Sequence, residues 1–85
     1  MFAKPKSAMF IDSVVFEVDH EEPSSSLQAV LKDEKGSVMS SMVAEIPQGQ
    51  KYYSWRGLND LPYGVYVLEL KTGENETRVR MIKRV

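Results

Sequence analysis

The stretch Leu61 to Leu70 (LPYGVYVLEL) constrains the fold more than any other part of the chain. Pro62 fixes its own φ near −65° and suits the second position of a β-turn, and Gly64 can take a positive φ or accept close backbone approach. After the glycine, large apolar residues alternate with a second set that ends in a charge. The inward set is Tyr66, Leu68 and Leu70, and the outward set is Val65, Val67 and Glu69. The stretch therefore predicts a turn followed by a strand with one buried face.

Short segments with the same two-residue alternation recur along the chain, separated by turn signals about every 8–12 residues. No segment carries apolar residues at the 3, 4 and 7 spacing of a helix. We therefore predict an all-β fold, a small antiparallel β-sandwich of six or seven strands in two sheets. The expected strand regions are 9–19, 27–32, 37–45, 51–55, 65–70 and 76–85.

Length and composition limit the chain to one small domain. It has 85 residues, no cysteine and a formal net charge of −1, which exclude a disulfide framework, a thiolate site and global steering toward nucleic acid. Residues 1–8 are polar and contain Pro5, so we expect a flexible lead-in followed by a single domain over 9–85. No apolar run approaches the ~18 residues of a transmembrane helix, and the first ten residues do not form a signal peptide.

Two polar clusters invite a catalytic or metal-binding interpretation. Residues 19–22 (DHEE) contain the only histidine, but a metal site needs ligands that converge from more than one element, so a solvated loop is the better interpretation. The serines 24–26 have no glycine-flanked elbow and no second histidine, so they are also read as a loop. The sequence thus predicts no catalytic residue, no metal site, no cofactor and no enzymatic activity.

Aromatic and basic residues form the remaining candidate surfaces. Four tyrosines and Trp55 fall within residues 52–66 and suit either a stacking platform or core packing. Parity favours the core for most of them and leaves Tyr52 and Tyr63 as the exposed candidates. Basic residues concentrate near the end of the chain, where a solvated strand face or a contact to an acidic partner would use them. These residues are Arg78, Arg80, Lys83 and Arg84.

Several short motifs occur in an order that is typical of one family. The chain reads LKDEKGSV at 31–38, SWRG at 54–57, LNDLPYGVY at 58–66, a Thr-Gly turn at 72–73 and a basic final strand, RMIKR, at 80–84. This order resembles the C-terminal sorting domain of Bacteroidetes proteins exported by the type IX (Por) secretion system. It also resembles the related immunoglobulin-like domain of flagellar hook-capping proteins. The Pro-Asn-Pro entry motif of the sorting domain is missing, and Leu31 stands where the family has valine.

The resemblance implies an immunoglobulin-like sandwich that acts as a folded secretion signal on a longer chain. Its partners would be the outer-membrane translocon and associated sorting proteins, and its location the cell surface or the medium, reached through the periplasm. The basic end also suits an anionic surface glycolipid. Recognition residues carried over from the family are Leu61, Gly64, Tyr66, Lys83 and Arg84.

Two other functions remain open at this point. One is an accessory immunoglobulin-like module that spaces or stabilises a neighbouring domain. The other is a stand-alone sandwich of the periplasm or cell surface that binds a protein partner. Neither requires a catalytic residue or a nucleic-acid partner.

Overall fold

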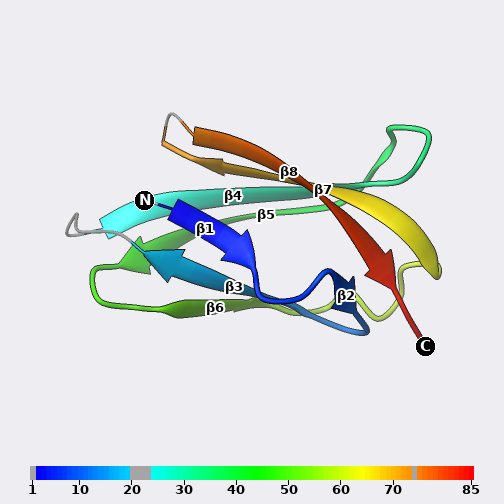
Figure 1. Ribbon diagram of the computed structural model, residues 1–85, viewed down its shortest axis with the longest axis horizontal. Coiled ribbons are helices and arrows are strands. Elements are labelled where there is room, and N and C mark those ends of the chain that lie inside the picture. The colour runs from blue at the N-terminus through cyan, green and yellow to red at the C-terminus, as the bar shows by residue number, and fades with distance from the viewer. Residues whose placement is uncertain (1, 20–23, 74) are drawn as a thin grey trace.

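The computed structural model describes residues 2–19, 24–73 and 75–85, and these form a two-layer β-sandwich without a helix (Figure 1). One sheet has three strands in the order β1-β3-β6, and the other has five in the order β2-β8-β7-β4-β5. The predicted all-β sandwich is confirmed. The bounds of the strands are β1 Phe2–Pro5, β2 Met9–Phe10, β3 Val14–Asp19, β4 Ser24–Lys32, β5 Val38–Pro47, β6 Tyr52–Trp55, β7 Gly64–Thr72 and β8 Asn75–Lys83.

Strand β7 lies at the centre of the five-stranded sheet, where it pairs with β4 on one side and β8 on the other. The predicted alternation holds, because Tyr66, Leu68 and Leu70 are buried while the residues between them are partly exposed. Gly64 has a φ of +143°, which explains why a glycine begins this strand. A Cβ at this position would meet open space, so its role is conformational and close backbone approach is not involved.

The N-terminal residues depart from the prediction. Residues 2–5, expected to belong to a flexible lead-in, form β1 and pair with β3, so the sandwich begins at Phe2. The expected first strand, 9–19, is split into β2 and β3. The split falls at Asp12, whose carbonyl accepts a hydrogen bond from the Leu58 amide (3.1 Å), and there the chain crosses from one sheet to the other.

The split and the additional strand β1 together raise the number of strands above the predicted six or seven, because the described residues form eight. It also introduces one parallel pair into an otherwise antiparallel structure. β2 runs parallel to the end of β8, with Met9 beside Ile82 and Phe10 beside Lys83.

Strands β4 and β5 form a long hairpin with one irregularity. Asp33 accepts hydrogen bonds from the amides of Lys35 and Ser37 (both 2.9 Å), and Gly36 takes the positive φ expected of it, +86°. Leu31 pairs with Ser40 but Lys32 pairs with Val38, so Met39 is an extra residue, a β-bulge. The bulge interrupts the strict alternation of β5, so Val38 is exposed while Met39 packs against the core together with Met42 and Ala44.

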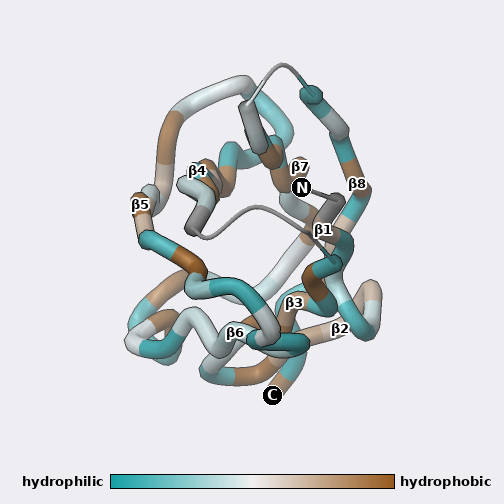
Figure 2. Tube along the Cα trace, turned by 90° about the vertical axis from the view of Figure 1, so that its left-hand side faces the viewer, coloured by the Kyte–Doolittle hydropathy of each residue, from teal (hydrophilic) through white to brown (hydrophobic). Residues whose placement is uncertain are grey.

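The core lies between the two sheets, which Figure 2 separates into an upper layer with β4, β5, β7 and β8 and a lower layer with β3 and β6. Phe16 stacks on Trp55 (ring centroids 6.5 Å apart), and both side chains are buried. The fully buried side chains are Phe16, Leu27, Leu31, Ile46, Leu58, Leu68 and Met81. In the described ranges, no helix could cross a membrane.

Candidate functional site

The residues that carry the family resemblance come together at one end of the sandwich. Leu61 and Gly64 lie in and directly after the turn that leads into β7, and Gly64 pairs with Lys83 at the end of β8. Residues 61–66 and 83–84 are therefore neighbours, although about 20 positions separate them in the sequence. We call this end of the molecule the Tyr63 surface, defined by Leu61, Tyr63, Gly64, Tyr66, Lys83 and Arg84.

Tyr66 fixes the geometry of this end from inside. Its side chain is 3% exposed, its ring packs edge-on against Phe10 (centroids 6.0 Å apart), and its hydroxyl donates to the Pro62 carbonyl at 2.6 Å. A tyrosine that bonds back to the backbone just before its own strand is the tyrosine corner of immunoglobulin-like sandwiches. Burial raises the pKa of the Tyr66 phenol above its usual 10.0, and the negative charge of Asp33 adds to the rise.

Lys83 is not the solvated basic residue that the sequence suggested. It is 3% exposed and points inward with Met81, because β8 alternates and Arg78 and Arg80 occupy the other parity. Its Nζ lies 5.1 Å from the centroid of the Tyr63 ring, a cation–π contact. Tyr63 itself is 63% exposed, so the ring forms the outer surface above a buried cation.

Arg84 is exposed, as predicted, and joins an apolar patch that the sequence did not indicate. Its guanidinium Nη1 lies 3.4 Å from the sulfur of Met9, and its amide donates to the Phe10 carbonyl at 2.8 Å. Met9 and Ile82 pair across β2 and β8 and are 50% and 39% exposed, and Ile11 next to them is 58% exposed. Only the parity of Ile82, between outward arginines, could have revealed this patch.

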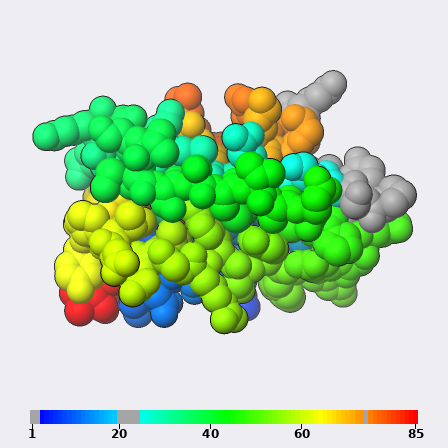
Figure 3. All heavy atoms as spheres, turned by 180° about the vertical axis from the view of Figure 1, so that it is seen from behind, coloured from blue at the N-terminus to red at the C-terminus, as the bar shows by residue number. Residues whose placement is uncertain are grey.

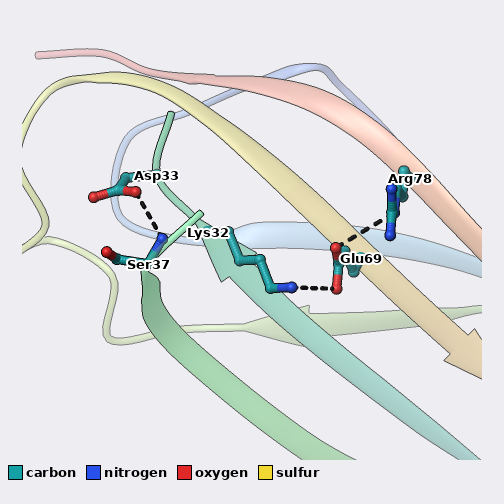
Figure 4. A network of polar contacts seen from close by, with 5 residues as sticks. All are labelled: Lys32, Asp33, Ser37, Glu69 and Arg78. Carbon is teal, nitrogen blue, oxygen red and sulfur yellow. Dashed lines mark hydrogen bonds and ion pairs between the residues drawn. The ribbon is translucent and has the colours of Figure 1, made fainter. Parts of the chain in front are cut away.

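Arg78 and Arg80 project from the outer face of the five-stranded sheet, as predicted. Glu69 accepts two cations from neighbouring strands: Lys32 Nζ at 3.1 Å and Arg78 Nε at 3.4 Å (Figure 4). Arg78 is thus partly neutralised by Glu69. Arg80 makes no ion pair among the described residues, and it remains a free surface charge.

The two exposed tyrosines do not share a platform. Tyr52 begins β6 in the three-stranded sheet, while Tyr63 precedes β7 in the other. Each lies beside its own lysine: Lys6 Nζ is 5.3 Å from the Tyr52 ring, as Lys83 is from the ring of Tyr63 at 5.1 Å. Both are more than half exposed, which confirms that they are the surface tyrosines of the aromatic cluster.

The polar clusters of the N-terminal half contribute no site within the described residues. Ser24 to Ser26 are the first residues of β4 and pair with residues 45–47 of β5, so the predicted loop is a strand there. Of the acidic cluster 19–22, only Asp19 is described, and it pairs with Phe2. Within the described ranges, no three potential metal ligands gather at one place.

The strand order defines the class of protein. Neighbours that are distant in sequence, β4–β7 and β3–β6, give Greek-key connections, and with the tyrosine corner they define an immunoglobulin-like β-sandwich. Comparisons of the chain with protein-family models, with curated proteins and with solved structures give no match.

Proposed function

We propose that this chain is a non-catalytic recognition module and that it acts as a folded sorting signal for type IX secretion. The observation that carries the proposal is the clustering of the motif residues. Residues 61–66 and 83–84 resemble the family's recognition region, and pairing of β7 with β8 brings them together at one end of the sandwich although the chain separates them.

The Tyr63 surface has features that suit recognition by another protein. Arg84 is exposed beside the apolar side chains of Met9 and Ile11, and the exposed ring of Tyr63 lies against Lys83 at the same end of the sandwich. An aromatic ring and a guanidinium next to aliphatic groups are the side chains that most often anchor a protein interface. The expected partners are the outer-membrane translocon and its sorting proteins. On this proposal the domain belongs to a longer chain and reaches the cell surface or the medium through the periplasm.

The exposed cations favour a second ligand on the same molecule. Arg80 and Arg84 lie on β8 and directly after it, and among the described residues neither forms an ion pair. An anionic surface glycolipid carries the phosphate or carboxylate groups that guanidinium binds well. Attachment to such a lipid would hold the exported protein at the surface.

The proposal is tested by fusing residues 2–85 behind a reporter that carries a signal peptide, in a Bacteroidetes host. The fusion begins at Phe2 because β1 belongs to the sandwich. The reporter should appear outside the cell, and Tyr63→Ala or Arg84→Gln should leave it in the periplasm without unfolding the domain. Lys83 is tested separately as Lys83→Met, which keeps the buried stem and removes the charge.

The matched control is Arg78→Gln, which removes an exposed cation from β8 far from residues 83–84. It should fold and export normally. If the unchanged domain is folded and the reporter still stays in the periplasm, the sorting function is wrong. The alternative is then an accessory immunoglobulin-like module that spaces or stabilises a neighbouring domain.

A further inference from the structure

Strand β5 leaves one long edge of the five-stranded sheet open. It spans Val38–Pro47, ten residues, and it is the last strand of the sheet, paired with β4 alone. In Figure 3 the green atoms of β5 run along the surface of the molecule. The cyan atoms of β4 lie above them, and the yellow-green atoms of the β6–β7 connection lie below them. No other described strand pairs with this edge. Backbone amides and carbonyls on the free side of an edge strand are ready to pair with another strand.

The side chains of β5 do not protect this edge. Its first seven residues, 38–44 (VMSSMVA), contain neither a charge nor a proline, and Glu45 is the only charged residue of the strand. Natural sheets usually protect an exposed edge with lysine, proline or a bulge. The bulge at Met39 lies near the start of the strand, so residues 40–47 continue in regular register with β4. Val43 is 69% exposed within this regular part.

We propose that β5 pairs antiparallel with β5 of a second copy of this chain, joining two five-stranded sheets into one continuous sheet. The pairing is isologous, so the same edge serves both copies and the assembly closes as a dimer. Its main-chain hydrogen bonds are those of any antiparallel ladder. This association is independent of the sorting function and uses the free edge of β5, none of whose residues belongs to the Tyr63 surface.

The single charge of β5 favours an antiparallel arrangement when the strand pairs with a second copy of itself. A two-fold axis near Ser41 and Val43 places the uncharged centre of each strand against the uncharged centre of the other. The two Glu45 carboxylates then lie at opposite ends of the pair, whereas a parallel arrangement would place them side by side. An uncharged, small and apolar strand is what this edge requires, and the strand itself meets that requirement.

The test is the dependence of molecular mass on concentration, measured by sedimentation equilibrium with the whole chain. We expect a monomer–dimer equilibrium in the wild type. Val43→Lys should weaken it at least about tenfold, because two like charges meet near the axis. The matched control is Ile11→Lys, which replaces an exposed aliphatic residue on the β2 side, and it should leave the dissociation constant unchanged.

A mixture of variants separates pairing of β5 with itself from binding to another surface. Val43→Lys and Val43→Glu should each be monomeric alone and should associate when mixed, because opposite charges then face each other. A wild type that stays monomeric at millimolar concentration overturns the proposal. So does a dimer that Val43→Lys does not weaken, and so does a mixture that fails to associate.

Discussion

The two edges of the five-stranded sheet are protected in different ways. On one side β8 is covered at its end by β2, and the rest of its edge carries Glu76, Arg78 and Arg80. On the other side β5 has no covering strand among the described residues, and its one charge is Glu45. Both edges belong to one sheet of one small domain. Edge protection is therefore a local property of the sequence, and the domain as a whole does not require it.

The difference between the two edges indicates where an interface with another strand can form. A charged and partly covered edge resists pairing with other strands, while an uncharged edge invites it. The chain places the charges of its sheet edges on β8 and leaves β5 free to add a strand. The following variants test this contrast, from the largest expected effect to the smallest.

Removing the cover of β8 should cost the most. Phe10→Ala deletes a side chain that is 4% exposed and packs against Tyr66, so we expect a loss of about 3–5 kcal/mol in the free energy of unfolding. Urea denaturation measures it. Val43→Ala on the open edge should change stability by less than about 0.5 kcal/mol. Equal losses at the two positions would show that β2 and β5 contribute alike.

Gly64 tests the turn that positions the end of β7 against β8. Gly64→Val forces a β-branched residue into a φ of +143°, and we expect a loss of about 1–3 kcal/mol from backbone strain alone. Thermal or urea unfolding gives the value. A loss below about 0.5 kcal/mol would mean that the backbone relaxes to ordinary strand dihedrals without cost.

Because of Tyr66, the free energy of unfolding of the domain should decrease at alkaline pH. The phenol of the unfolded chain ionises near pH 10.0, whereas the folded phenol, with its raised pKa, keeps its proton to higher pH. The stabilising contribution is therefore fully present below pH 10 and is lost as the pH rises through the folded pKa.

Tyr66→Phe is the variant that isolates this effect. It should cost about 0.5–1.5 kcal/mol at neutral pH, because the hydrogen bond to Pro62 is lost. In this variant the free energy of unfolding should also decrease less steeply above pH 10. Denaturant unfolding from pH 8 to 11 compares the two proteins, and identical slopes would contradict the assignment to Tyr66.

Charge protection of the β8 edge should affect solubility more than stability. Arg78→Gln combined with Arg80→Gln removes exposed charges, so unfolding should change by less than about 1 kcal/mol. Light scattering at high concentration should nevertheless rise, because the edge is no longer protected. The control, Lys51→Gln with Arg56→Gln, makes the same change in net charge at exposed positions that flank β6 in the other sheet, and it should not scatter more.

Much of the sandwich could be predicted because alternation is a local signal. β7 and β3 alternate buried residues with more exposed ones along their length, and β7 occurs where the sequence placed it. The turn at Gly36 followed from the glycine and the preceding Asp33. These features depend on residues close in sequence, so no knowledge of the opposite sheet was needed.

The remaining features depend on pairing between distant segments. β1 has four residues and little apolar alternation, and it forms a strand by pairing with β3, which lies about a dozen positions further along the chain. The bulge at Met39 changes which residues of β5 face the core. No residue type in the sequence indicates a bulge at this position. Lys83 was counted with the outward arginines by its charge, although the alternation through Val79 and Met81 places it inside.

The sequence predicted which residues belong to the candidate site, but their arrangement in space is known only from the fold. Pairing of Gly64 with Lys83 could not be read from either segment alone. Arg84 and Met9 lie 75 positions apart, and their contact could not be predicted from the sequence either.

The parallel pair of β2 and β8 has a mechanical consequence. Tension applied between a tether before Met9 and one after Arg84 pulls these two strands in opposite directions along their length. The hydrogen bonds from Ile82 to Ala8 and from Arg84 to Phe10, both 2.8 Å, then carry the load together in shear and do not open one after another. A domain attached to a longer chain would thus resist unfolding under tension between these two points, and the two-residue strand β2 would carry the load.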